Sequence, residues 1–453
     1  MREGASLEAR RLASLALGRV EDEGAYLHLA LRGLLRQHAT TARAAARATA
    51  LAAGVLRWKT RLDWALQRVS AWPLTAVDTP VRQVLRVAAY EIGFTSTPPP
   101  IAVDLAVRLT RRLHPEASGF VNAVLRALVR ASRDGMPAPA GGPVDERLAI
   151  TYGHPRWLVR RWLDRFGLAT TEAILRANNE PSPPTVRVNL MRTTPASLQR
   201  RWAAEGIPSA AGALVSFAVE IHLPGRSLEQ LPGYDEGLFS PQSEASMLPA
   251  LVVGSVAGET AADLCSAPGG KATQIAEMAE DQAHVLAFDR HAGRLGLVRR
   301  NARRLGLRSL RFAVADARRP PLGAGSLDAV LLDAPCTDLG TVRRRPDVRW
   351  RRRPEDVEEM ARLQRQLLDA AAGLIRPGGR LVYSVCSFER EETTEHLAYV
   401  AERHGMQAVP VEAMAAWRGP RGTGADREGM TLLPHEVRTD GFFVVRFEPL
   451  RRV

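Results

Sequence analysis

The stretch Asp263-Leu264-Cys265-Ser266-Ala267-Pro268-Gly269-Gly270-Lys271 decides how the second half of this chain is expected to fold. Residues Glu259–Ala262 before it indicate the end of a short buried strand. Residues Ala272–Ala279 after it indicate a helix, with Ile275 and Met278 spaced to face inward. A strand, a Pro-Gly-Gly turn and a helix form a nucleotide-type binding loop, because glycine admits a ligand close to the backbone and the helix offers free N–H groups. The loop matches neither the P-loop nor the Gly-x-Gly-x-x-Gly pattern.

Three further strands are expected to follow this loop. Val285–Asp289 is apolar and ends in an acid roughly 20 residues beyond the glycines, a position that suits ribose hydroxyls. Leu310–Asp316 and Leu327–Asp333 repeat the pattern. Parallel strands of an open α/β fold bind ligands at their carboxyl ends. The acids expected at that edge are Asp263, Asp289, Asp316 and Asp333.

The length and charge of the chain set its broad class. It has 453 residues, which favours two or three domains, and 45% hydrophobic residues, which is ordinary globular material. The 62 Lys and Arg residues against 49 Asp and Glu residues give a net charge of +13. An excess of arginine favours a polyanionic partner such as nucleic acid. A GC-rich genome that prefers Arg and Ala is the alternative explanation.

The cysteine content and the lack of apolar runs indicate the compartment. Three cysteines, without zinc-type spacing, favour a reducing cytosol and predict no metal site. The N-terminal residues lack a signal sequence, and no apolar run reaches the length of a membrane span. We therefore expect a soluble, cytoplasmic protein without a membrane partner.

The chain is expected to be multidomain. Residues 1–135 are predicted to be all-helical, residues 145–235 to form a small α+β unit with a strand at Thr185–Asn189, and residues 236–453 to form the α/β domain. The Pro- and Gly-rich segment Arg133–Pro143 is interpreted as a linker. Helices of the first domain are expected at Thr40–Trp58, Leu62–Val69, Val81–Tyr90, Ile101–Arg112 and Gly119–Arg130.

Two of the cysteines follow expected strands. Cys336 stands in Asp333-Ala334-Pro335-Cys336 after the fourth strand, and Cys386 ends a fifth strand that begins at Arg380 after a Gly378-Gly379 turn. A buried cysteine is usually an inert small apolar residue. Two cysteines at the sheet edge that carries the ligand loop favour a chemical role, whereas Cys265 is expected to pack.

The loop Cys265–Lys271, the Asp333–Cys336 segment and Ser384-Val385-Cys386-Ser387 resemble the RNA 5-methylcytosine methyltransferases, which use S-adenosylmethionine on a Rossmann-like, class I sheet. More closely, the chain resembles the bacterial 16S ribosomal RNA methyltransferase B family. The N-terminal domain of that family is similar to the antitermination factor NusB. The matching segments are Val84–Glu91, Phe120–Arg126 and Thr439–Phe443.

The resemblance implies a role for each residue of the motifs. Cys386 matches the nucleophile that adds to cytosine C6, Asp333 would hold the cytosine edge and border the cofactor, and Cys336 matches the cysteine that acts in product release. Asp289 would bind the ribose of S-adenosylmethionine and Asp316 its adenine. The methionine end would contact Cys265, Ser266, Ala267, Pro268, Gly269, Gly270 and Lys271.

The chain departs from the family pattern at two places. Val385 stands where the family usually has Thr before the nucleophile, and Thr337-Asp338 stands where it commonly has Ser-Gly after Cys336. The added negative charge is expected to change substrate fit. The role of Lys271 beyond cofactor contact stays open, and lowering a thiolate pKa by proximity is one possibility.

The segment Arg343–Arg353 holds seven arginines around Trp350, which suits RNA phosphates and a stacked base. The resemblance implies that small-subunit ribosomal RNA, or the assembling small subunit, is the partner of a monomeric enzyme. Transfer RNA as substrate is an alternative, and so is a non-catalytic RNA-binding assembly or antitermination factor. An amino-group methyltransferase would carry Asn/Asp-Pro-Pro-Tyr/Phe in place of Asp333–Cys336.

Overall fold

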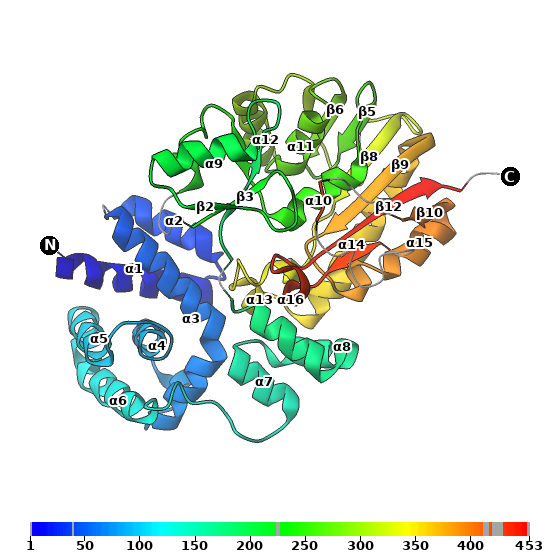
Figure 1. The fold of residues 1–453 in the computed structure, drawn as a ribbon. Helices are drawn as coiled ribbons and strands as arrows, with labels where there is room; N and C mark the ends of the chain where they lie inside the picture. Colours follow the sequence, from blue (N-terminus) through cyan, green and yellow to red (C-terminus); the bar gives the residue numbers. More distant parts are fainter. Residues whose placement is uncertain are drawn as a thin grey trace. The chain divides into compact units, whose positions relative to one another are not determined.

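The computed structural model describes residues 2–38, 40–180, 182–222, 227–410, 416–418 and 429–450. The chain divides into two compact units. The first contains the residues up to Asn179 together with Arg345–Arg351, and the second contains most of the remainder from Glu180 onward (Figure 1). None of the described helices combines the length and the apolar character needed to cross a membrane.

The first unit is helical throughout its described residues, which confirms the all-helical prediction. Its α-helices are α1 (Arg2–Asp22), α2 (Leu27–Gln37), α3 (Ala42–Val69), α4 (Thr79–Phe94), α5 (Pro99–Leu113), α6 (Ser118–Ala131), α7 (Val144–Tyr152), α8 (Arg156–Ala177) and α13 (Val348–Arg351), with 3₁₀ turns at η1 (Leu74–Ala76) and η2 (Pro115–Ala117). Apolar side chains of α1 to α6 form one core. The prediction of separate helices at Thr40–Trp58 and Leu62–Val69 was wrong, because Lys59-Thr60-Arg61 contains no helix breaker and α3 runs through it.

A small sheet opens the second unit. Its strands are β1 (Thr185–Val188), β2 (Ser209–Ala211), β3 (Ala218–Ile221) and β4 (Phe239–Pro241), in the antiparallel order β2-β3-β1-β4. Helix α9 (Pro195–Ala204) packs on it through Trp202, whose ring lies edge-on to Phe239 at 5.3 Å between centroids, and η3 (Leu228–Gln230) follows.

The large sheet of the second unit carries the expected parallel strands. Its strands are β5 (Thr260–Asp263), β6 (His284–Asp289), β7 (Leu310–Val314), β8 (Leu327–Asp333), β9 (Ile375–Val385), β10 (Met406–Val409), β11 (Met430–Leu432) and β12 (Phe442–Pro449). The order is β10-β12-β9-β8-β5-β6-β7, with β11 paired to β12. Strands β9, β8, β5, β6 and β7 are parallel, and β12 is antiparallel to β9 (Figure 1).

Helices cover both faces of this sheet. Helices α10 (Glu244–Val253), α11 (Gly270–Met278) and α12 (Ala292–Leu305) share one apolar core with it. Helices α14 (Pro354–Gly373) and α15 (Glu395–His404) share the other. Shorter helices are η4 (Leu339–Thr341), η5 (Arg390–Glu392) and α16 (Pro434–Val437). The predicted layout of a helical domain, a small middle sheet and a Rossmann-like domain is confirmed, while the boundaries at 1–135, 145–235 and 236–453 stay a prediction.

Two local expectations differ from the structure. Strand β7 ends at Val314, so Asp316 lies beyond the strand rather than at its end. The Gly378-Gly379 segment, expected as a turn before the fifth strand, lies inside β9. There β9 bulges between the partners of Leu327 and Ala329, and Gly378 takes a φ of +79°, which glycine adopts without strain.

Candidate active site

The loop between β5 and α11 lies at the carboxyl end of the parallel strands. Ser266 anchors it, because its backbone N–H and its Oγ both donate to the carbonyl of Phe288, at 2.8 and 2.9 Å. Gly269 turns the chain with a φ of +110°, and a Cβ there would lie 3.0 Å from the Cα of Val298. Glycine is therefore required for both the backbone angle and the close approach of α12.

A solvent-open cavity of about 200 Å³ lies in front of this loop. Its walls include Gln242, Asp263, Asp333 and Arg344, and six of the seven expected loop residues, which are Cys265, Ser266, Ala267, Pro268, Gly270 and Lys271. The sheet edge and the loop thus line one pocket, with polar side chains and backbone groups facing it.

Asp263 is a buried carboxylate at the wall of this cavity. Its side chain is 1% exposed, Oδ1 accepts from the backbone N–H of Cys265 at 3.2 Å, and Oδ2 has no hydrogen-bond partner within the described residues. Burial raises the pKa of Asp263 to about 7, and the neighbouring charge of Asp333 adds to the effect. A buried carboxylate oxygen left open at a cavity fits a cationic group of a ligand.

Asp333 and Lys271 form an ion pair at the end of β8. Lys271 Nζ donates to Asp333 Oδ2 at 2.6 Å, and Ser384 Oγ on β9 donates to Asp333 Oδ1 at 2.8 Å. Burial works to lower the pKa of Lys271, but the charge of Asp333 outweighs it and the pKa is raised. Lys271 is thus a fixed cation, and both oxygens of Asp333 are held in place.

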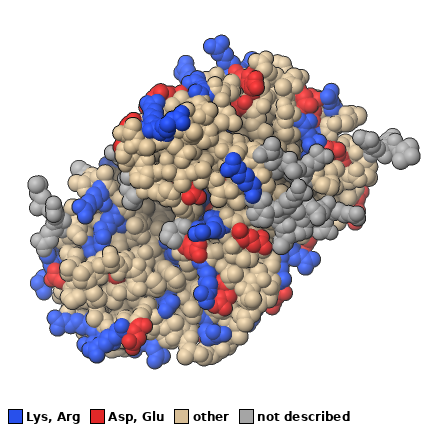
Figure 2. Space-filling view, in the orientation of Figure 1, with Lys and Arg blue, Asp and Glu red and all other residues tan. Residues whose placement is uncertain are grey.

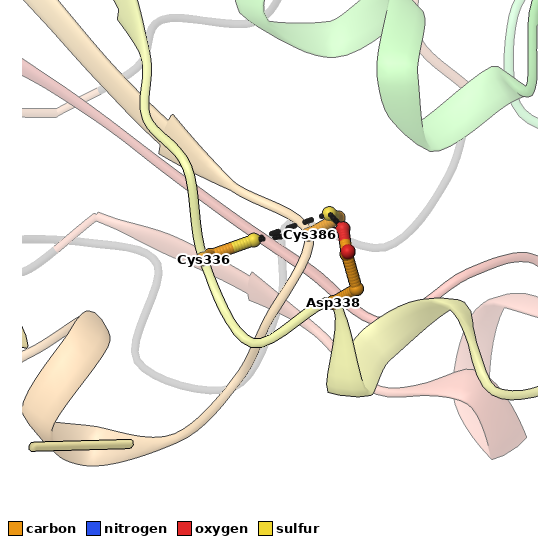
Figure 3. Close-up of side chains that lie close together, drawn as sticks. All are labelled: Cys336, Asp338 and Cys386. Carbon is orange, nitrogen blue, oxygen red and sulfur yellow. Dashed lines mark hydrogen bonds between the residues drawn. The ribbon is translucent and has the colours of Figure 1, made fainter. Parts of the chain in front are cut away.

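The two expected chemical cysteines meet at the same edge (Figure 3). Cys336 follows β8 and Cys386 follows β9, and their sulfur atoms lie 3.2 Å apart. Cys386 Sγ donates to Asp338 Oδ1 at 3.0 Å. Parallel strands that are neighbours in the sheet end side by side, which is why residues 50 positions apart in the chain come into contact.

Both thiols have a raised pKa, which favours their protonated form at neutral pH. The contact with Cys336, burial and the charge of Asp338 raise the pKa of Cys386 well above its ordinary value. The contact with Cys386 works to lower the pKa of Cys336, but burial and nearby Asp338 and Glu392 outweigh it, so that this pKa is also raised.

Glu392 on η5 forms hydrogen bonds with both cysteine loops, which are the segments that follow β8 at Cys336 and β9 at Cys386. It is fully buried and accepts from the backbone N–H of Thr337 at 2.8 Å, from Ser387 Oγ at 2.5 Å and from Gln364 Nε2 at 3.1 Å. Gly340 adds a second link, because its N–H donates to the carbonyl of Cys386 at 3.0 Å and a Cβ there would lie 2.0 Å from the carbonyl of Gly441. The separation of the two sulfur atoms is therefore set by packed backbone.

Family models match three parts of the chain. Residues 250–448 match the 16S rRNA methyltransferase RsmB/F model, residues 7–130 match the NusB family, and residues 154–226 match the ferredoxin-like domain of RsmF/B-like methyltransferases. Over 450 residues the chain is 33% identical to the "probable ribosomal RNA small subunit methyltransferase B" of Bacillus subtilis (strain 168), an alignment that covers 96% of this chain and 97% of the relative. The chain belongs to the 16S rRNA methyltransferase RsmB/F family.

Other relatives agree with this membership. The ribosomal RNA small subunit methyltransferase B of Pectobacterium carotovorum subsp. carotovorum (strain PC1) is 32% identical over 97% of this chain and 98% of its own. The solved structure named PH0851 is 27% identical with a TM-score of 0.80, and the match covers 98% of each chain. The structure of NSun6 from Pyrococcus horikoshii with SFG is 25% identical with a TM-score of 0.57, over 66% of this chain and 99% of that one.

This RsmB/F-family enzyme is a methyltransferase, and its cofactor is S-adenosylmethionine. The cavity fits that cofactor on one observation of this chain. The free oxygen of Asp263 suits a ligand ammonium group.

Two of the expected cofactor residues, Asp289 and Asp316, are not among the described residues that line the cavity. Asp289 is buried at the end of β6 and accepts from the backbone N–H of His291 at 2.8 Å. Asp316 is half-exposed and bound to Arg318 at 2.6 Å, a pair whose hydrogen bonds lower the pKa of Asp316 to about 2. Cys265 lines the cavity, and burial raises the pKa of its thiol.

The interpretation of Arg343–Arg353 as an RNA-binding segment was wrong for its central residues. Arg349 is fully buried in the helical unit, where Nη1 donates to the carbonyl of Gly153 at 2.9 Å and Nη2 to that of Asn178 at 3.3 Å. The Nε1 of Trp350 donates to the carbonyl of Leu56 at 2.6 Å, and its ring packs against the helical core. These groups bind protein, so they are not available to phosphates or bases.

Several residues of the site escaped the sequence analysis. Asp263 was placed at the sheet edge but given no role, Asp338 was noted only as a departure, and Ser384 and Glu392 were not singled out. A strand-end acid directly before the ligand loop was the signal for Asp263. No local pattern marks Glu392, because its partners come from three separate segments.

Proposed function

We propose that this methyltransferase acts on C5 of a cytosine in small-subunit ribosomal RNA, through a covalent adduct between Cys386 and cytosine C6. One observation carries the proposal. Two cysteine sulfur atoms lie 3.2 Å apart at neighbouring strand ends, next to a carboxylate held by Lys271 and Ser384. Methyl transfer to an amino group or a hydroxyl needs no pair of thiols.

The chemistry explains why a thiol is required. Cytosine C5 is a poor nucleophile, and addition of a thiolate to C6 turns the C5 position into an enamine carbon. In our assignment Cys386 makes this bond. Asp333 holds N3 and the exocyclic amino group of the ring, which is the edge where charge develops during addition. Because Lys271 and Ser384 fix the position of Asp333, it is a preorganised partner for that edge.

The pocket in front of the loop would hold S-adenosylmethionine, which supplies an electrophilic methyl group when bound. We assign the methionine end to Cys265–Lys271, with Asp263 facing the ammonium group. Asp289 would bind the ribose and Asp316 the adenine. Because Asp316 is paired with Arg318, we expect that pair to open when the adenine binds.

Release of the product requires loss of the C5 proton and of the bond to Cys386. We assign the second half of the reaction to Cys336, whose sulfur lies next to that of Cys386. Glu392 and Gly340 act as positioning residues, since they join the two cysteine loops.

The names of the relatives, which describe small-subunit ribosomal RNA methyltransferases, and the net charge of +13 support ribosomal RNA as the substrate. Lys and Arg side chains lie at several separate places on the face seen in Figure 2. Beside the ligand loop, α12 exposes Arg294, Arg299, Arg300 and Arg303. The target base has to leave its stack to reach Cys386. We propose that α12 binds the phosphates that flank this base. The substrate would be free RNA or an assembling small subunit, and the enzyme would act as a monomer.

The test uses Cys336→Ala, Cys386→Ala and the double variant, each incubated with S-adenosylmethionine and small-subunit RNA. We expect Cys336→Ala to accumulate a protein–RNA adduct on denaturing gels, and the double variant to form none. Cys265→Ala removes the third cysteine and should accumulate no adduct, whatever its effect on cofactor binding, while wild type is the control for turnover. Absence of methyl transfer by wild type would reject ribosomal RNA, and transfer RNA would then be tested. Failure with both RNAs would favour a non-catalytic assembly or antitermination factor.

A further inference from the structure

Asp338 occupies a backbone position that disfavours most side chains. It follows Cys336 by two residues, and its φ is +61°, in the left-handed region where glycine is favoured and Asp or Asn is tolerated. Such backbone angles persist where the surrounding structure enforces them, and they occur often in active sites. Here the angle turns a carboxylate toward the sulfur of Cys386 (Figure 3).

The carboxylate is held in two directions. Oδ1 accepts from Cys386 Sγ at 3.0 Å and lies 4.0 Å from Cys336 Sγ, while Oδ2 lies 3.5 Å from Arg352 Nη2. Arg352 is itself fixed, because its Nε donates to the carbonyl of Thr337 at 2.6 Å and its Nη2 to that of Cys336 at 3.2 Å. The side chain of Asp338 is 25% exposed, so a proton on it can exchange with solvent.

Addition of Cys386 to a cytosine requires the removal of the proton from the cysteine thiol. Besides Asp338, five charged or titratable groups surround the two cysteines, which are Cys336, Lys271, Arg344, Arg352 and Glu392. The arginines and the lysine are already paired with carboxylates, and a cation cannot accept a proton. Asp338 Oδ1 is the carboxylate oxygen that the S–H group contacts.

We propose that Asp338 is the proton acceptor for Cys386 in methyl transfer, an inference that rests on the proposed function. When sulfur attacks C6, the S–H bond breaks, its electron pair forms the S–C6 bond, and the proton moves to Asp338 Oδ1. The π pair of C5=C6 moves to C5, which then takes the methyl group. At release the C5–H bond breaks, its proton passes to solvent water and its pair restores C5=C6. The S–C6 bond breaks with its pair on sulfur, and sulfur recovers the proton from Asp338.

The test compares wild type with Asp338→Asn, which keeps the shape and tolerates the left-handed backbone but accepts no proton. Two rates are measured on the full chain. The first is single-turnover methyl transfer to RNA from pH 6 to 9. The second is alkylation of Cys386 by iodoacetamide without RNA or cofactor, followed by peptide mass spectrometry.

We expect the two rates to move in opposite directions. Methyl transfer by Asp338→Asn should fall by about 10²- to 10³-fold at pH 7, because general-base catalysis is lost, and should rise with pH more steeply than in wild type. Alkylation of Cys386 should become about tenfold faster at pH 7, because the thiolate no longer faces a negative charge. A purely structural role would not separate these readouts.

Other results would overturn the inference. If methyl transfer and alkylation both become faster, Asp338 only lowers the reactivity of the Cys386 thiol. If neither rate changes, Asp338 has no role in the reaction of Cys386. If both fall together with affinity for S-adenosylmethionine, its role is structural. Asp369→Asn is the control, because Asp369 is a partly exposed carboxylate whose partners include His404 and Tyr399, and both rates should stay at wild-type values. A wild type that transfers no methyl group to any RNA rejects the proposed function and the inference with it, whereas an active wild type matched by Asp338→Asn rejects the inference alone.

Discussion

Two clusters of buried charge in this molecule are built on different principles. At the edge of the large sheet, Asp263 keeps an oxygen without a partner and Lys271 pairs with Asp333 beside an open cavity. In the helical unit, Arg349 is fully buried and both of its terminal nitrogens donate to protein oxygens. The first cluster has an unused acceptor at a cavity wall, whereas in the second the terminal nitrogens of the guanidinium bind protein oxygens and only Nε of Arg349 lacks a partner among the described residues.

The difference separates function from stability. An unused acceptor at a cavity wall is costly unless a ligand satisfies it, so Asp263 indicates a binding site. A guanidinium surrounded by the carbonyls of Arg57, Gly153 and Asn178 holds chain segments together. A run of charged residues in a sequence can therefore form either a binding site or a structural cluster, and the hydrogen-bond partners of those residues decide which.

The largest expected effect concerns stability. Arg349→Met should lower the free energy of unfolding by about 3 kcal/mol, because the carbonyls of Gly153 and Asn178 lose their donor in a buried place. Urea denaturation followed by far-UV circular dichroism measures it. Arg126→Met on the exposed side of α6 is the matched control and should change stability by less than about 0.5 kcal/mol. Equal losses in the two variants would mean that Arg349 has no special structural role.

The second effect concerns the cofactor. Asp263→Asn should weaken binding of S-adenosylmethionine by about 10- to 100-fold in isothermal titration calorimetry, because a charge-assisted contact in a buried site is lost. Since the pKa of Asp263 is about 7, wild-type affinity should fall as pH decreases below 7, where the carboxylate becomes protonated. The variant should lack this dependence, and exposed Asp235→Asn should keep it. If the affinity of wild type for S-adenosylmethionine does not depend on pH, the ammonium group of the cofactor does not bind at Asp263.

The third effect is a pH dependence of folding. Burial, with Arg349 nearby, holds the pKa of His154 well below its ordinary value, and its Nδ1 lies 2.7 Å from the carbonyl of Tyr152. The unfolded chain then binds more protons below about pH 6.5, so the free energy of unfolding should fall there by up to about 1.4 kcal/mol per pH unit. Because burial also lowers the pKa of His396, to about 4, the measurement is the difference between wild type and His154→Gln. Parallel curves would exclude His154 as the source.

The smallest effect tests the surface of α12. Arg299→Ala and Arg303→Ala should each weaken RNA binding by about threefold and reduce the slope of log K against log salt concentration by about 1. Fluorescence anisotropy at several salt concentrations measures both. Leu297→Ala, an exposed neutral neighbour on the same helix, should leave the slope unchanged. Unchanged slopes in the arginine variants would mean that RNA binds to a surface other than α12.

Much of the site was predictable from local patterns. The apolar segments before Asp263, Asp289 and Asp333 form strands, and Cys336 and Cys386 follow β8 and β9 as expected. The prediction worked because hydrophobic runs bounded by turn residues specify strands, and the carboxyl ends of parallel strands meet. The roles given to these residues stay predictions.

The sequence by itself determined the strand–loop–helix core, the order of the acids along the sheet edge and the presence of two strand-end cysteines, since each depends on neighbours in the chain. Tertiary structure alone decided that Arg349 is a structural residue and that Asp338 faces Cys386. Arg349 bonds to a carbonyl 196 positions away and Asp338 to a thiol 48 positions away. Every residue type offers a backbone carbonyl, so no sequence pattern marks the acceptor of a buried charge.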